Sequence, residues 1–242
     1  MNNRTDNSSA SPAPVAETVA AGLQAGWPIC LGYLPIGLAF GVLAQKSGLS
    51  PLEIGLMSTM VFAGSSQFIA VSMIAAGAAG PSIILTTFMV NLRHFLMSSA
   101  LSLFVGGTGR GRLALLAYGV TDESFAVSYA RFKTGGWSVE RALVVNHSAN
   151  LAWILSTVAG GYGGRFIPAG AFGIDYALIA MFICLLVFQL NGRRYLITAL
   201  VAGGLSVPLS LTVPGNLHVV IAASAAATVG VYLIDARRRG SQ

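Results

Sequence analysis

The chain alternates between long runs of apolar residues and short stretches of charged or turn-forming residues. A helix that crosses the hydrocarbon core of a bilayer needs about 20 mostly apolar residues. Divided at its polar stretches, the sequence predicts eight such spans, at residues 23–45, 54–77, 82–105, 113–130, 142–162, 174–190, 195–213 and 217–234. The fourth is short and contains Asp122 and Glu123. The seventh contains Gly203, Gly204 and Pro208, which makes it a candidate for a bend or a re-entrant loop.

The composition agrees with this pattern. Of the 242 residues, 55% are hydrophobic and 9% are charged, whereas a soluble domain carries about 25% charged residues. The predicted fold is therefore an all-α polytopic membrane protein with some kinked or discontinuous helices. The net charge of +6 comes from basic residues scattered between apolar runs, which favours loops flanking membrane helices over a nucleic-acid surface. No pattern for a metal or another cofactor is found.

Basic residues predict the orientation, because loops on the cytoplasmic side carry an excess of Lys and Arg. With eight spans, the side of both termini receives Arg4, Arg131, Lys133, Arg141, Arg193, Arg194, Arg237, Arg238 and Arg239. The other side receives Lys46, Arg110, Arg112 and Arg165. Both termini are therefore expected in the cytoplasm. We expect a disordered polar tail at residues 1–20, a single transmembrane domain at 21–236 and a basic tail at 237–242.

The first span, "WPICLGYLPIGLAFGVLAQ", contains Pro28 and Pro35, which each remove a backbone donor. Gly37 and Gly41 form a small-xxx-small pair. The pattern fits a kinked packing helix, and it also fits a discontinuous helix whose freed backbone groups face a substrate.

The second span contains "FAGSSQFIA", in which Gly64, Ser65, Ser66 and Gln67 lie near the middle. The serine hydroxyls can bond to the nearby backbone. The carboxamide of Gln67 needs a partner in hydrocarbon. It is expected either to join helices or to contact a substrate.

The third span, with "FMVNLRHFLMSS", places Arg93 close to mid-membrane beside Asn91 and His94. An arginine at that depth costs at least about 2.5–3.5 kcal/mol, so a partner is expected. The fourth span offers Asp122 and Glu123 at matching depth. Adjacent acids point about 100° apart, so that one can pair with Arg93 while the other faces another neighbour or a cavity. This ion pair either fixes the helix register or handles a substrate.

The fifth span contains "VVNHSANLAW", in which Asn146 and Asn150 share one helix face. Interhelical hydrogen bonding and cavity lining are both open roles for Asn146.

Five motifs together resemble a known family: "GYLPIGLAFGVLA", "GLSPLEIGLMSTMVFAGSSQFIA", "VNLRHFLMSSALS", "TDESFA" and "GIDYALIAMFICLLV". In this order and spacing the chain resembles AzlC, the large subunit of branched-chain amino acid exporters, over most of residues 20–235. The resemblance implies a multi-pass permease of a prokaryotic inner membrane that exports leucine, isoleucine, valine or related amino acids. It also implies a small membrane subunit, AzlD, as partner. The polar motifs of the family fall on Pro35, Gly37, Gly64, Gln67, Asn91, Arg93, His94, Asp122 and Glu123.

A zwitterionic substrate suggests roles for these residues. The carboxylate would bind Arg93 or the N-terminal amides of a broken half-helix in the first or second span. The ammonium would bind Asp122 or Glu123. Since no G-x-x-x-x-G-K-[ST] loop is present, ATP is not the expected energy source. A secondary carrier, coupled to protons through a carboxylate or His94, is predicted.

Other classes of function are weighed against this carrier. A passive amino acid channel or a small-solute efflux permease would also need a polar path, although buried opposite charges fit alternating access better. An intramembrane hydrolase built from Ser65, Ser66, His94 and Asp122 lacks any G-x-S-x-G or H-E-x-x-H pattern. A non-catalytic assembly subunit is disfavoured by the size of the chain.

Overall fold

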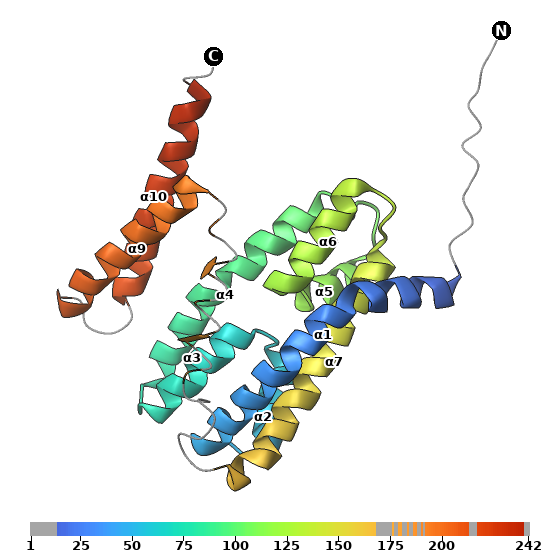
Figure 1. The fold of residues 1–242 in the computed structure, drawn as a ribbon, viewed down its shortest axis with the longest axis horizontal. Coiled ribbons are helices and arrows are strands. Elements are labelled where there is room, and N and C mark those ends of the chain that lie inside the picture. The colour runs from blue at the N-terminus through green and yellow to red at the C-terminus, as the bar shows by residue number, and fades with distance from the viewer. Residues whose placement is uncertain are drawn as a thin grey trace. The chain divides into compact units, whose positions relative to one another are not determined.

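All regular elements described by the computed structural model are helices (Figure 1). The structure describes residues 14–167, 192–212 and 217–239, with isolated positions between 176 and 190. The helices are α1 (Val15–Lys46), α2 (Pro51–Met60), α3 (Gly64–Ala75), α4 (Gly80–Ser102), α5 (Arg110–Tyr118), α6 (Asp122–Thr134), α7 (Val139–Gly163), the short 3-10 helix η1 (Gly164–Phe166), α9 (Arg193–Thr212) and α10 (Leu217–Arg239). The predicted all-α class is confirmed. The span predicted at 174–190 lies largely outside the described residues.

Four described helices are long and apolar enough to cross a membrane: α1, α4, α7 extended by η1, and α9. Helix α3 and residues 221–232 of α10 are shorter apolar helices. Lengths of 20 residues and more match the thickness of the hydrocarbon core. The fold is that of a polytopic helical membrane protein, whereas the total of eight spans and the cytoplasmic termini stay predictions.

The chain divides into two compact units. The first unit contains residues Met1–Leu34 and His94–Trp153, and the second contains Pro35–Arg93 and Ile154–Gln242. Helices α1, α4 and α7 contribute residues to both units. The core of the first unit is formed by Val105, Leu116 and Ala142 with Phe104, Leu113, Phe132, Trp137, Val139 and Leu143 around them. The second unit contains an edge-to-face contact of Phe40 with Phe68, whose ring centroids are 5.1 Å apart.

Two predicted domain boundaries fall within helices. Helix α1 begins at Val15, so residues 15–20 of the expected polar tail are helical. Helix α10 continues to Arg239, inside the expected basic tail at 237–242. The three predicted regions themselves stay predictions.

The first span is one uninterrupted helix. Helix α1 passes through Pro28 and Pro35, both of which are exposed. Each proline removes one backbone donor, but the hydrogen bonds on either side continue the helix. Helix α9 likewise continues through Pro208. The structure therefore decides for a continuous packing helix in the first span and for a continuous helix in the seventh, where a bend or a re-entrant course stays a prediction.

Glycines allow close approach of α1 to α7 within each unit. In the first unit, a Cβ on Gly22 would lie 2.6 Å from Cβ of Val144. In the second unit, a Cβ on Gly37 would overlap the Ser156 side chain, and one on Gly41 would overlap the carbonyl oxygen of Thr157. The small-xxx-small pair predicted at Gly37 and Gly41 is thus a helix contact.

Substitution of these glycines should separate packing from helix propensity. We expect Gly41→Ala to lower the melting temperature of the purified chain, because overpacking against a backbone carbonyl costs about 1–3 kcal/mol. Gly32→Ala is the matched control on α1, since nothing lies within 4 Å of its added Cβ. The control should be neutral or slightly stabilising. Equal melting temperatures for the two variants, measured in the same detergent, would contradict the close contact.

The second and fourth predicted spans are each interrupted. Residues 61–63 separate α2 from α3, and residues 119–121 separate α5 from α6. The second span was among those left open for a break, but the single helix predicted over 113–130 is wrong. The reason lies in local capping, because Gly119 ends α5 and Thr121 begins α6 with a side-chain cap. Both breaks create a half-helix whose N-terminus starts inside a predicted span.

Candidate functional site

The break in the second unit is held by a strained, buried residue. Phe62 has φ of +36° and is 1% exposed. For a bulky side chain this backbone conformation costs energy, and it persists only when the surrounding packing enforces it. Ala63 is the N-cap of α3 and has no side-chain oxygen to bind the first amides. Helix α3 therefore begins without the cap that most helices use.

Ser65 and Arg93 meet at the start of α3. The guanidinium of Arg93, on α4, donates a hydrogen bond through Nη2 to Oγ of Ser65. Ser65 is buried in the first turn of α3. A helix N-terminus carries a partial positive charge of roughly half an elementary charge. The second unit therefore combines a guanidinium with the positive end of a half-helix, and an anion would stabilise both.

Gln67 belongs to a buried chain of hydrogen bonds that joins three helices. Its Nε2 donates to Oγ of Ser58 on α2 at 3.2 Å, and Ser58 Oγ lies 2.9 Å from Oγ1 of Thr157 on α7. All three side chains are fully buried. This arrangement gives Gln67 the interhelical role that the sequence left open, and a substrate contact of Gln67 stays a prediction.

The remaining predicted residues of the second unit are Pro35, Gly37, Gly64 and Asn91. Pro35 is exposed on α1, and Gly37 faces Ser156 of α7. Gly64 is the first residue of α3. Asn91 is half-buried on α4, and among the described residues its Oδ1 has no hydrogen-bond partner. Of this group, only Gly64 belongs to the α3 N-terminus.

The break in the first unit is capped in full. Thr121 Oγ1 accepts from the amide of Ser124 at 3.3 Å, and Ser124 Oγ accepts from the amide of Thr121 at 2.9 Å. Asp122 and Glu123 occupy the first turn of α6. Carboxylates at that position are stabilised by the positive end of the helix dipole. The two acids therefore lie at a helix start, where they help α6 begin, and not in the middle of a continuous helix.

Tyr33 connects α1 to this helix start. Its hydroxyl donates to Oε2 of Glu123 at 2.7 Å and lies 2.9 Å from Oγ1 of Thr121. The ring packs edge-to-face against Trp153 with centroids 5.3 Å apart. Tyr33 is 8% exposed. A hydrogen bond to an ionised carboxylate is roughly twice as strong as one between neutral groups, so Tyr33 fixes the position of Glu123.

Asn146 supports the same break from α7. Its Nδ2 donates to the carbonyl oxygen of Leu116, in the last turn of α5, at 3.0 Å. A Cβ on Gly119 would lie 2.6 Å from Cβ of Asn146, so only glycine fits between the two segments. Asn146 thus satisfies a carbonyl at the end of α5. Of the two roles that the sequence left open, interhelical hydrogen bonding and cavity lining, this contact is the first.

The predicted ion pair joins residues of different units. Arg93 belongs to the second unit, whereas Asp122 and Glu123 belong to the first. The pairing of Arg93 with either acid therefore stays a prediction. His94 is a half-buried residue of the first unit, and its predicted role also stays a prediction.

Sequence reasoning missed the residues that hold the breaks. Tyr33, Ser58 and Thr157 carry single hydroxyls within apolar runs, and nothing local marks their partners. Thr121 did carry a signal, because "GVTDES" presents a glycine, then a capping residue, then two acids, as helix starts do. Among the described residues no group of three or more His, Cys, Asp or Glu side chains could hold a metal ion.

The fold and the two breaks define the class of protein. Long apolar helices combined with half-helices that begin inside predicted spans are typical of membrane transporters. The model of the AzlC protein family matches residues 28–167, which include both breaks. The chain belongs to the AzlC family. No solved structure matches the chain.

Three curated relatives each cover more than three quarters of the chain. The inner membrane protein YgaZ of Escherichia coli K12 is 31% identical over 211 residues, which cover 84% of this chain and 86% of the relative. The branched-chain amino acid transport protein AzlC of Bacillus subtilis 168 is 30% identical over 197 residues, which cover 80% and 76%. An uncharacterized membrane protein of Archaeoglobus fulgidus is 31% identical over 192 residues.

Proposed function

We propose that the chain is the large subunit of an exporter for branched-chain amino acids, namely leucine, isoleucine and valine, or related hydrophobic amino acids. The family and the name of the Bacillus subtilis relative support this substrate class. The name of the Escherichia coli relative and the apolar helices support an inner, or plasma, membrane location in a prokaryote. The function is transport and not catalysis.

The observation that carries the proposal is the contact of Arg93 with the start of α3. A free amino acid presents a carboxylate, and the α3 N-terminus offers amides of Gly64, Ser65 and Ser66 together with a guanidinium. Helix N-termini are preferred sites for carboxylates and phosphates. The half-helix therefore supplies the carboxylate site that a zwitterionic substrate requires.

In the first unit, the start of α6 carries negative charge. Asp122 and Glu123 are half-buried in the first turn of α6, and Glu123 is held by Tyr33. A buried carboxylate can exchange a proton or bind an ammonium group. We propose that these two acids carry the coupling proton, and a contact with the ammonium of the substrate stays a prediction.

The energy source follows from the sequence. Without a phosphate-binding loop the chain has no known means of using ATP, so a proton-coupled secondary carrier is proposed. A small AzlD-like membrane subunit is the proposed partner. Large apolar side chains, including Ile84, Phe88, Phe95 and Leu96, are exposed along α4, as on a helix that faces lipid or another membrane protein.

Counterflow in proteoliposomes tests this function. Vesicles that contain the chain and its small subunit are loaded with unlabelled leucine and then diluted into labelled leucine. A carrier should concentrate the label transiently and saturate with concentration, whereas a passive channel shows neither. A panel of valine, isoleucine, methionine, alanine and glutamate as loading substrates would identify the substrate class. Absence of counterflow with every amino acid would refute the proposal.

A further inference from the structure

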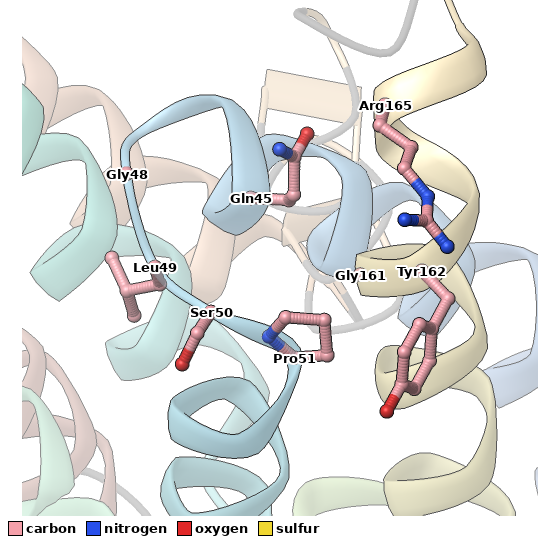
Figure 2. Close-up of a pocket in the computed structure, with 8 residues that line it drawn as sticks. All are labelled: Gln45, Gly48, Leu49, Ser50, Pro51, Gly161, Tyr162 and Arg165. Carbon is pink, nitrogen blue, oxygen red and sulfur yellow. The ribbon is translucent and has the colours of Figure 1, made fainter.

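A pocket lies where α1 ends, α2 begins and α7 ends, all within the second unit (Figure 2). It has a volume of about 460 Å³ and is lined by Gln45, Gly48, Leu49, Ser50, Pro51, Gly161, Tyr162 and Arg165. Figure 2 shows Arg165 and Tyr162 on the α7 side, with Ser50 and Pro51 across from them. Pockets that bind small molecules have volumes of about 300–1,000 Å³, so this cavity is large enough for a ligand.

Three side chains of the lining carry uncommitted donors. Within the part of the chain that the structure describes, the side chains of Gln45, Tyr162 and Arg165 form no hydrogen bond, although the guanidinium of Arg165 lies 5.0 Å from the centre of the Phe166 ring. The neighbouring Lys46 differs, because its Nζ donates to the carbonyl oxygen of Ile167 at 2.7 Å. A carboxamide and a guanidinium can both donate to an acceptor-rich ligand, whereas Figure 2 shows the hydroxyl of Tyr162 pointing away from Arg165 and Gln45.

The charge of the lining favours an anion. Arg165 is the one charged residue among the eight, and none of them is acidic. The adjacent acid, Glu53, already accepts from the amide and the hydroxyl of Ser50, each at 2.7 Å. These hydrogen bonds hold the pKa of the Glu53 carboxyl below its ordinary value, so that it stays ionised and compensates the start of α2. A cation in this pocket would be repelled by Arg165 and would find no carboxylate in the lining to bind it.

The position of the pocket indicates where the anion comes from. Helices α1 and α7 are candidate membrane spans, and the pocket lies at the ends of both. Tyr162 and Phe166 are 56% and 77% exposed beside it. Exposed aromatic residues together with Arg or Lys mark the depth of lipid headgroups. Leu49 and Pro51 add apolar surface to the lining.

We propose that this pocket binds the headgroup phosphate of an anionic phospholipid, with Arg165 as its charged ligand and Gln45 as a neutral donor, while the ring of Tyr162 lines the site. The guanidinium fork can bind two phosphate oxygens at once. Basic pockets between membrane helices on the cytoplasmic side recognise lipid headgroups in this way, and here the same chemistry would act on the side that the basic residues predict to be non-cytoplasmic. The site is independent of the proposed transport function, because it includes no residue from the start of α3 or the start of α6.

Lipid retention by the purified full-length chain tests the proposal. The delipidated chain in detergent is titrated with short-chain phosphatidylglycerol, and bound lipid is counted by native mass spectrometry. Phosphatidylcholine, inorganic phosphate and leucine are the comparison ligands. We expect phosphatidylglycerol to bind most tightly, Arg165→Gln to weaken it about tenfold and Arg165→Lys to weaken it less. Arg110→Gln, which alters an exposed arginine that does not line the pocket, should change nothing.

The outcomes separate the sources of the ligand. Equal retention by the Arg165→Gln and Arg110→Gln variants would overturn the site. Equal affinity for phosphatidylcholine would overturn the anionic specificity, and equal affinity for inorganic phosphate would replace the lipid with a soluble anion. Competition by leucine would make the pocket part of the substrate path and overturn the lipid assignment. The melting temperature of each variant without lipid is measured first, so that only folded variants are compared. Gln45→Ala is a second variant that tests the lining of the pocket. None of these readings requires transport.

Discussion

Arg93→Ala is expected to reduce leucine counterflow about 100-fold, the largest effect predicted for a single substitution in the second unit. The guanidinium lies against Ser65 in the first turn of α3, where we place the substrate carboxylate. Hydrogen bonds to charged groups contribute about 1.5–3 kcal/mol each, which corresponds to roughly 10–100-fold in affinity. A bidentate contact places the loss near the upper end of that range.

Conservative variants distinguish binding from folding. Arg93→Lys keeps the charge but loses the planar fork, so it should raise KM more than it lowers the maximal rate. Ser65→Ala removes the hydrogen bond that Arg93 donates, and a smaller rise in KM is expected. Removing an arginine from the membrane interior relieves an insertion cost, so loss of transport without loss of melting temperature would identify a functional role.

Substrate analogues sharpen the same test. The wild-type chain should discriminate leucine from 3-methylbutylamine, which has the same alkyl chain and no carboxylate. If Arg93 binds the carboxylate, Arg93→Ala should lose most of this discrimination, because the missing contact is the one that the analogue lacks. Unchanged discrimination with a lower rate would show that Arg93 acts elsewhere in the cycle. Arg110→Ala, which alters an exposed residue, is the control.

Glu123→Gln is expected to abolish proton-driven leucine flux while leaving exchange of leucine for leucine measurable. A carboxylate that must gain and lose a proton in each net cycle cannot be replaced by an amide, whereas exchange needs only the loaded states. Glu123 is held by Tyr33 and begins α6. We expect Asp122→Asn to lower transport as well. Wild-type flux in both Glu123→Gln and Asp122→Asn would refute the assignment of the acids.

Tyr33→Phe tests the support of Glu123. The variant keeps the ring that packs on Trp153 and removes the hydroxyl that reaches Glu123 and Thr121. Proton-driven flux should fall about tenfold, in line with the loss of one charge-assisted hydrogen bond. In a double-mutant cycle measured by melting temperature, Tyr33→Phe should have little further effect once Glu123 is Gln. Additive losses would contradict a shared network, and Tyr195→Phe, at an exposed tyrosine of α9, is the control.

The sequence predicted the elements whose signal is local. An apolar run long enough to cross a bilayer is recognisable without knowledge of its neighbours, and α1, α4 and α7 lie where the pattern places them. The polar exceptions were also visible, since Ser65, Arg93 and Glu123 stand out in apolar surroundings. A membrane interior makes each such residue costly, so its presence alone indicates a partner or a ligand.

The breaks could be predicted only in part. Residues 61–63 follow no proline, and the strained Phe62 persists because of packing around it. Conversely, Pro28 and Pro35 suggested a break that α1 does not have. The start of α6 was encoded locally by Thr121 and its acids, and recognising that cap would have corrected the fourth span.

By itself the sequence determined that this protein is helical, polytopic and charged at a few membrane-depth positions. The reason is that a run of about 20 neighbouring apolar residues identifies a membrane span without knowledge of the rest of the fold. The tertiary structure decided which partners those positions have. Tyr33 meets Glu123 across 90 residues of chain, and Ser58 meets Thr157 across 99. Such contacts depend on how distant helices pack, and packing is set by shape and by buried hydrogen bonds that no short segment encodes.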